Sequence, residues 1–213
     1  MGIQINQYPL TATEINNDDF FDVDQWNGTA FESKKISGAT LRAGVIPGLF
    51  TQTSDVTVTA TTTESTLLGT GQGTLIVPAN GFQVGDTFQL RMCGLIDAHN
   101  NDTFTFKIKS GSVILAISGA ITMPTCTGKT FEFIADFCIR AIGSTGVAEI
   151  VSNGSFCYNK NSSNAFEGQN FLSVNNTTFD TTVGNTLNVT VQFSSTNAGN
   201  SLTSKVVYLT KSF

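Results

Sequence analysis

The sequence has few charged residues. Of its 213 residues, 11 are Lys or Arg and 16 are Asp or Glu, so 13% are charged, half of the usual ~25% in globular domains. The formal net charge is -5, and the basic residues are dispersed along the chain. A general nucleic-acid binder needs clustered Lys and Arg to neutralise phosphates, so this class is excluded and no nucleic-acid partner is expected.

Long apolar runs and targeting signals are missing as well. The N-terminal stretch MGIQINQYPL contains no basic segment followed by an apolar run, and no segment approaches ~18 consecutive apolar residues. We therefore expect neither a signal peptide nor a membrane span, and no membrane partner.

Cysteine and histidine do not form patterns that support chemistry. Cys93, Cys126, Cys138 and Cys157 contain no C-x-x-C pair, which fits neither a zinc site nor a small disulfide framework, so free thiols are expected. His99 is the only histidine and thus the only candidate proton carrier for a Ser-His-Asp device. Its run, DAHNNDT, is typical of a solvated loop, although three copies near the axis of a homotrimer could hold one metal ion.

Carboxylates and glycines give no active site either. Glu132 and Asp136 share one face of a predicted strand, but at ~3.3 Å per residue they are ~13 Å apart, beyond the ~5–9.5 Å of glycosidase pairs. The acidic cluster at 14–24 lacks the EF-hand spacing of a Ca²⁺ site. Thr127–Thr130 resembles the end of a P-loop, but Met123 stands where a glycine is required. We predict no catalytic, cofactor-binding or metal-binding residue, and no enzymatic activity.

Uncharged polar residues and phenylalanine are abundant instead. There are 31 Thr, 18 Ser and 18 Asn, together nearly a third of the chain, and 17 Phe. A hydrophobic content of 40% is too high for a disordered tail, so the chain can build a core. At ~100–200 residues per domain, the length fits one domain plus an appendage.

The first 50 residues differ from the rest. They hold six of the sixteen acidic residues, the only Trp and a dense aromatic run, and Asn27-Gly28 is the strongest two-residue hairpin signal. We predict a hairpin over residues 19–36, followed by a short helical turn that Ser37 caps and Pro47-Gly48 ends. A piece this small cannot bury its aromatic residues on itself, so it is expected to dock onto other copies of the chain or another protein.

From Asp55 onward the pattern is that of β-strands. Apolar and polar residues alternate between turn signals about eight to twelve residues apart, and helical periodicity is absent. In Phe131–Arg140 one face is apolar and the other mostly polar, and Phe88–Cys93 and Leu187–Phe193 show the same split. Gly143–Gly146 is expected to close a hairpin. The predicted strands are Asp55–Ala60, Thr74–Val77, Asp86–Ile96, Thr103–Lys109, Ser112–Ser118, Thr130–Ile142, Gly146–Tyr158, Asn188–Phe193 and Thr203–Lys211.

The predicted fold class is all-β, an antiparallel β-sandwich with a small N-terminal hairpin. Around nine strands over ~160 residues favour a jelly roll over the seven-stranded immunoglobulin sandwich. The Cys-Trp-Cys spacing of an immunoglobulin domain is also missing.

Long stretches of the sequence resemble a known family. The run PLTATEINNDDFFDVDQWNGTAFESKKISGATLRAGV resembles the N-terminal attachment segment of tailed-bacteriophage fibre proteins, where a DxFDV…G…ESKKISGAxLR-type stretch precedes variable fibre domains. The downstream part, from TTTESTLLGTGQGTLIVPANGFQVGDTFQLRMCGLI through NAFEGQNFLSVNNTTFDTTVGNTLNVTVQF, resembles the jelly-roll knob at the ends of such fibres and of related virion proteins. These resemblances cover nearly the whole chain, which departs from long fibres in having no heptad or β-helical shaft.

The resemblance implies a structural virion protein, a homotrimeric head fibre or capsid decoration with TNF/C1q-like jelly rolls, assembled in the host cytoplasm. Residues 1–50 would be the virion-attachment segment, which inserts into a capsid or tail protein, and residues 51–213 the outward-facing knob. The residues expected to anchor it are Phe20, Phe21, Trp26, Phe31 and Leu41. Those expected near the trimer interface are Arg91, Cys93, Asp136, Cys138 and Arg140, with an ordinary solvent-exposed strand face as the alternative.

Two other functions remain open. The knob could be the receptor- or glycan-binding tip of a tail fibre, with Cys157–Asn164 and Val174–Thr178 as loops that hydrogen-bond a host surface glycan. An enzyme such as a depolymerase would depend on Glu132, Asp136 or His99.

Overall fold

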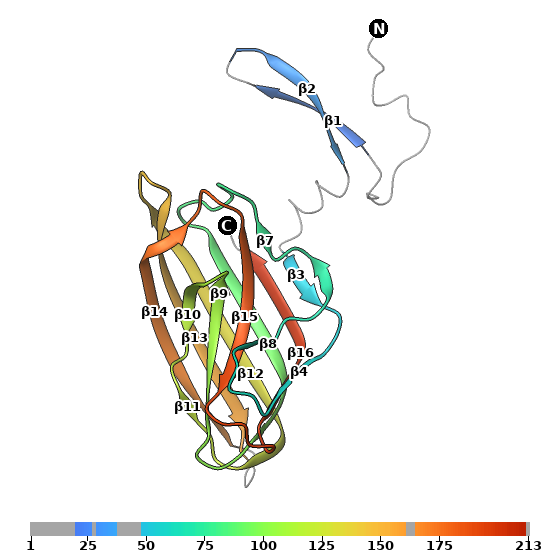
Figure 1. Cartoon of the computed structure of the whole chain (residues 1–213). Helices are drawn as coiled ribbons and strands as arrows, with labels where there is room; N and C mark the ends of the chain where they lie inside the picture. Colours follow the sequence, from blue (N-terminus) through green and yellow to red (C-terminus); the bar gives the residue numbers. More distant parts are fainter. Residues whose placement is uncertain (1–19, 27–28, 38–47, 161–164, 212–213) are drawn as a thin grey trace, which may run out of the picture. The chain divides into compact units, whose positions relative to one another are not determined.

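The computed structural model describes residues 20–26, 29–37, 48–160 and 165–211 (Figure 1). The chain divides into two compact units, Met1–Pro47 and Gly48–Phe213. All regular structure in the described residues is β-strand. The division lies close to the predicted boundary after residue 50, and the second unit begins slightly earlier because a strand that starts at Gly48 pairs with the last strand of that unit.

The first unit contains an antiparallel hairpin. Strands β1 (Phe20–Trp26) and β2 (Phe31–Ser37) pair along their whole length, so the hairpin predicted over residues 19–36 is confirmed. The side chain of Phe31 is 71% exposed. The helical turn predicted after Ser37 and the other predicted anchoring side chains, those of Phe20, Phe21, Trp26 and Leu41, lie outside the described part of the chain.

The second unit is a sandwich of two antiparallel sheets. In the described residues the larger sheet has eight strands in the order β14-β13-β12-β8-β16-β3-β6, with β4 beside β16. Its strands are β3 (Gly48–Gln52), β4 (Val56–Thr59), β6 (Gly71–Gly73), β8 (Thr87–Ala98), β12 (Cys126–Ile142), β13 (Val147–Asn159), β14 (Phe166–Asp180) and β16 (Ser201–Lys211).

The smaller sheet has six strands among the described residues, in the order β10-β9-β15-β5, with β11 beside β9 and β7 beside β15. Its strands are β5 (Ser65–Thr66), β7 (Ile76–Val77), β9 (Thr103–Ser110), β10 (Val113–Ile117), β11 (Ile121–Thr122) and β15 (Asn185–Phe193). The two sheets confirm the predicted all-β antiparallel sandwich.

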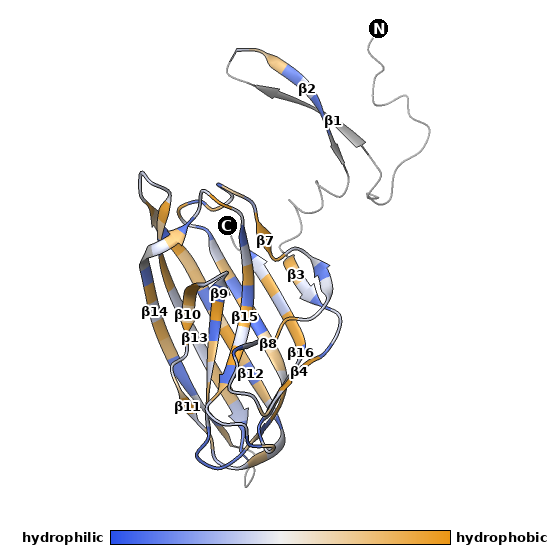
Figure 2. Cartoon of the chain, in the orientation of Figure 1, coloured by the Kyte–Doolittle hydropathy of each residue, from blue (hydrophilic) through white to orange (hydrophobic). Residues whose placement is uncertain are grey.

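Hydrophobic and hydrophilic residues alternate along the strands of the sandwich (Figure 2). A strand turns successive side chains to opposite faces, so alternation buries one row and leaves the other outside. The predicted core rows of β12, β8 and β15 are all buried, which confirms the pattern. These residues are Phe131, Phe133, Ala135, Phe137 and Ile139 on β12, Phe88, Leu90 and Met92 on β8, and Leu187, Val189, Val191 and Phe193 on β15.

Phenylalanine rings from both sheets fill the space between them. The ring of Phe106 on β9 stacks on that of Phe133 on β12, with centroids 4.5 Å apart. Phe104 on β9 meets Phe156 on β13 edge to face at 5.1 Å. Stacked and edge-to-face arrangements add a favourable electrostatic contribution to the burial of large apolar rings. The rings therefore join β9 of one sheet to β12 and β13 of the other.

Side chains close the edge of the sandwich at which β10 and β14 meet. Ser173 on β14 accepts a hydrogen bond from the main-chain N–H of Ile117 on β10 at 3.2 Å. Asn175, two residues along the same strand, donates to the main-chain carbonyl of Ile114 at 3.0 Å. These bonds satisfy main-chain groups of β10 that would otherwise face outward, so β14 covers the edge of β10.

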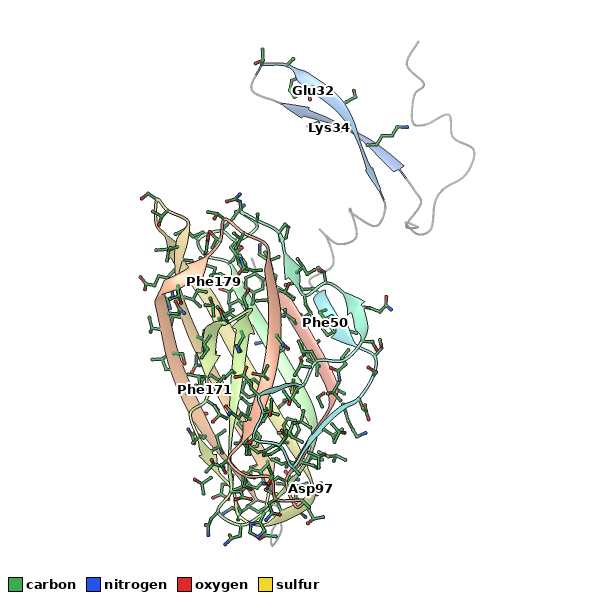
Figure 3. All side chains as sticks on the ribbon, viewed as in Figure 1. Glu32, Lys34, Phe50, Asp97, Phe171 and Phe179 are labelled. Atoms are coloured by element: carbon green, nitrogen blue, oxygen red, sulfur yellow. The ribbon has the colours of Figure 1, made fainter. Side chains whose placement is uncertain are left out.

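The chain enters and leaves the sandwich at the same end. Gly48 on β3 lies opposite Thr210 on β16, so the first and last strands of the second unit meet there, and we call this the entry end. The loop that joins β8 to β9 lies at the opposite end, the far end. Figure 3 shows Asp97 at the far end and Phe179 toward the entry end.

The segments predicted as glycan-binding loops are strands where the structure describes them. Val174–Thr178 belongs to β14, and Cys157–Asn159 to β13. Residues 161–164 lie outside the described part of the chain. Val174 and Asn175 pair with Val151 and Ile150 of β13, and the register of the two strands then shifts before Phe179 pairs with Ala148. The Asn- and Thr-rich run therefore lies at an irregularity of this strand pair.

An ion-pair cluster holds the segment before β5 on the outside of the smaller sheet. The carboxylate of Glu64 accepts hydrogen bonds from Lys107 and Lys109 on β9, both at 2.7 Å, and from Thr190 on β15 at 3.0 Å. The side chain of Glu64 is 24% exposed. Desolvation by burial raises the pKa of Glu64, but these hydrogen bonds lower it by more, so the pKa falls from 4.5 to about 2.

Replacing Phe106 by Ala should destabilise the sandwich by ~3–5 kcal/mol, because it empties a fully buried ring site at the contact between the sheets. Chemical denaturation of the variant and the wild type gives the difference. Val84→Ala is the matched control, since Val84 is 62% exposed, and its effect should stay within ~0.5 kcal/mol. Equal effects of the two substitutions would contradict the aromatic core.

Replacing Glu64 by Gln should lower the free energy of unfolding by about 2 kcal/mol at neutral pH, because two lysines lose their carboxylate. The folded-state pKa is depressed, so the stabilisation is present above pH 4.5 and is lost as the pH falls toward about 2. Unfolding curves of wild type and variant should therefore converge over that range. Asp55→Asn, which breaks the exposed pair with Lys205, is the control and should cost at most ~1 kcal/mol. A Glu64 effect independent of pH would contradict the pairing.

Candidate functional site

The far end brings together a Ser, a His and an Asp, but not as a catalytic triad. Asp102 lies 3.6 Å from the imidazole of His99 and accepts a hydrogen bond from Ser195 at 2.7 Å. Hydrogen bonds from Ser195 and Asn200 lower the pKa of Asp102. A nucleophilic serine must instead donate its proton to the histidine, with the carboxylate behind it. Here the serine donates to the carboxylate, so the arrangement fixes the loop conformation and activates no nucleophile.

The P-loop-like segment Thr127–Thr130 lies within strand β12. A phosphate site needs main-chain N–H groups that are free to bind an anion. The N–H of Gly128 donates instead to the carboxylate of Asp97 at 2.6 Å. The geometry therefore agrees with the absence of a glycine at position 123 and gives no phosphate cradle.

The two carboxylates of β12 are each held by a neighbour on β8. Glu132 forms an ion pair with Arg91, and Asp136 accepts a hydrogen bond from Gln89 at 3.0 Å. Hydrogen bonds to Tyr208 and Glu132 raise the pKa of Arg91. The charges of Arg91 and Glu132 thus neutralise each other within one chain.

The side of the larger sheet that faces away from the smaller sheet is the candidate functional site, and we call it the outer face. Arg91 lies beside Ile134, Cys93 beside Glu132, and Gln89 beside Asp136. Of the five predicted interface residues, Arg91, Cys93, Asp136 and Cys138 share this face. Arg140 is exposed, but it lies at a bulge between Ile139 and Ala141, outside the aligned rows.

Three half-buried thiols lie on the outer face. Cys93 and Cys157 flank Glu132 on either side, and Cys138 lies further along β12. All four cysteines of the chain fall within described residues and are free, as predicted. Burial raises the pKa of both Cys93 and Cys157, and the charge of Glu132 raises each of them further. The thiols of Cys93 and Cys157 therefore stay protonated near neutral pH and behave as small apolar groups.

Exposed apolar side chains lie on the edge strand β14 and on β16 of the larger sheet. Leu172 and Val174 on β14 are 70% and 60% exposed, and Val206 on β16 is 55% exposed. The β14 pair was missed from the sequence because the run FLSV has apolar residues on both faces, so alternation gave no outward row. A weaker signal was available: two large apolar residues, at positions 172 and 174, at period two.

A shallow polar depression of about 290 Å³ opens on the outer face between β12, β13 and β14. Asp136, Asn153, Ser155 and Asn170 surround it, with Ile134 among its lining residues. A carboxylate and two amides around an apolar side chain offer the donors and acceptors that a neutral sugar requires.

The described residues contain no group of three or more His, Cys, Asp or Glu side chains that could hold a metal ion, and no helix that is long and apolar enough to cross a membrane. Part of the acidic cluster of residues 14–24 lies outside the described residues.

Comparison of the chain with protein-family models, curated proteins and solved structures finds no match.

Proposed function

We propose that the chain is a structural virion protein of a tailed bacteriophage, a homotrimeric head fibre or capsid decoration anchored by its N-terminus. The observation that carries the proposal is the outer face, a broad sheet surface whose central Arg91 and Glu132 form an ion pair within one chain and which carries exposed apolar side chains on β14 and β16. Protein interfaces are depleted in charge at their core in this way. The assignment to a virion rests on the sequence resemblance to tailed-bacteriophage fibre proteins.

The first unit is the proposed virion-attachment segment. It is a compact unit of its own with an antiparallel hairpin, and the predicted anchoring residue Phe31 exposes 71% of its side chain. An exposed aromatic ring on a small hairpin favours contact with another polypeptide. The chain passes from this segment into the sandwich at the entry end, which leaves the far-end loops for the outward-facing tip.

The proposed fold of the knob is a jelly roll. The order β4-β16-β8-β12 in one sheet and β5-β15-β9-β10 in the other supports it, because a jelly roll places eight strands in two sheets through two Greek keys. Strands β13 and β14 then form an additional hairpin that widens the larger sheet beside β12.

The outer face is the proposed trimer interface. Arg91, Cys93, Asp136 and Cys138 lie on it, and the protonated thiol of Cys93 adds little desolvation cost. Burying this face would remove water from Arg91 and Glu132 together, as a pair that is already formed.

Light scattering of the purified full chain at micromolar concentration should give the mass of three copies. The segment 48–213 alone should also give three copies, because the proposed interface lies wholly within the sandwich. A monomeric full chain would contradict the proposal.

Trimer assembly and attachment to the virion can be tested separately. The full chain and segment 48–213 are each added to phage particles that lack the protein. The full chain should bind the particles, and segment 48–213 should remain unbound while staying trimeric. Equal binding of both proteins would remove the anchoring role of the first 47 residues.

The second candidate is a glycan-binding tip, and the depression beside Asp136, Asn153 and Asn170 favours it. Burial of the outer face in a trimer would cover this depression, so the two uses of the face exclude each other. A glycan array probed with the wild type and with Asn153→Ala distinguishes the two candidates. Glycan binding by the wild type that Asn153→Ala reduces at least tenfold would favour the glycan-binding tip. An array without signal would remove it.

A further inference from the structure

A second depression, of about 320 Å³, opens where the turn between β9 and β10 meets the segment that joins β14 to β15, and we call it the corner depression. The side chains that line it and matter here are those of Ser110, Ser112, Val113, Asp180, Val183 and Thr186. Asp180 directly follows Phe179, which lies toward the entry end (Figure 3).

A buried hydrogen-bond network fixes the lining of the corner depression. Ser110 and Asn185 are 7% and 6% exposed, and the hydroxyl of Ser110 donates to Oδ1 of Asn185 at 2.8 Å. The amide of Asn185 donates to the main-chain carbonyls of Asp180 and Val183, at 3.0 and 2.9 Å. The network thus ties β9 and β15 to the loop between β14 and β15. A preformed lining lowers the entropic cost of binding a ligand.

The carboxylate of Asp180 is charged and keeps one oxygen available. Its Oδ1 accepts hydrogen bonds from the hydroxyl and the N–H of Thr182, at 2.6 and 2.8 Å. These two bonds lower the pKa of Asp180, so the group is ionised at neutral pH. Within the described part of the chain, Oδ2 accepts no hydrogen bond and the carboxylate forms no ion pair. A charged oxygen that is held in place in this way is a strong acceptor for a ligand.

Hydroxyl groups and apolar side chains complete the lining. Ser112 and Thr186 are exposed, and a hydroxyl both donates and accepts hydrogen bonds. Val183 is 51% exposed and Val113 is half-buried. A sugar ring matches this combination, because its hydroxyl groups also donate and accept and its C–H face is apolar. An ammonium or guanidinium group has donors alone, so it would use the carboxylate but none of the hydroxyl donors.

We propose that the corner depression binds a neutral sugar residue. Asp180 accepts hydrogen bonds from the sugar hydroxyls, and Val113 and Val183 contact its C–H face. The volume of about 320 Å³ lies at the lower end of the ~300–1,000 Å³ of small-molecule sites, which suits a single sugar ring.

The corner depression is not part of the outer face. Most of its lining belongs to the smaller sheet and to the loop before β15. Burial of the outer face in a trimer would therefore not by itself cover it, in contrast to the depression beside Asp136. The inference adds a ligand to the proposed virion protein and does not depend on how many copies assemble.

The test titrates the full chain with glucose, galactose, mannose and N-acetylglucosamine by isothermal titration calorimetry. At least one sugar should bind, and Asp180→Asn should weaken its binding by about tenfold or more. The amide keeps an oxygen for Thr182 but replaces the charged acceptor by a donor. Asp55→Asn, the same change at an exposed aspartate, is the matched control and should leave the affinity unchanged. Circular dichroism checks that both variants keep their strands.

NMR spectra of the main-chain amides locate the bound sugar without any substitution. The sugar should shift the amide resonances of Gly111 and Gly184, which line the corner depression, and not that of Gly154 in the depression beside Asp136. Shifts at Gly154 alone, an affinity that Asp180→Asn leaves intact, or no binding of any of the four sugars would overturn the inference. Binding of methylammonium but of no sugar would overturn it as well and would identify a cation site. None of these outcomes changes the mass of the assembly, so the inference can fail while the proposed homotrimer stands.

Discussion

Ring packing between the two sheets is the interaction on which the rest of the sandwich depends. Phe104 and Phe106 of β9 reach Phe133 and Phe156 of the larger sheet, and a second group of rings lies nearer the entry end. That group is Phe82, Phe88, Phe137 and Phe179. Because strand side chains alternate, each inward ring sends its neighbours outward, and the composition of those neighbours sets the character of the outer face.

The outer face follows from that constraint together with the low charge of the chain. Its central charged pair, Arg91 and Glu132, is neutralised internally, and the thiols of Cys93 and Cys157 are protonated. Such a surface offers little to an ionic ligand and much to a flat, uncharged partner. It is therefore suited to the proposed packing of copies around an axis, and the N-terminal hairpin belongs to the unit proposed for attachment.

Much of this architecture was accessible from the sequence. The alternation of apolar and polar residues predicted the inward rows of β8, β12 and β15, and Asn27-Gly28 predicted the hairpin of β1 and β2; the structure confirms both. The outward placement of Arg91, Cys93, Asp136 and Cys138 followed from the same period of two. Strand β14 was not predicted, since Phe171, Leu172 and Val174 place apolar residues on both of its faces; its pairing with β13 makes it a strand.

The sequence alone determined the buried rows of β8, β12 and β15, because residues of the same parity along a regular strand share one face. It also determined the low charge of the chain as a whole. Only the tertiary structure decided which strands are neighbours. Ile114 and Asn175 meet across the closed edge, because the fold brings together residues that are distant in the chain and that no local pattern relates.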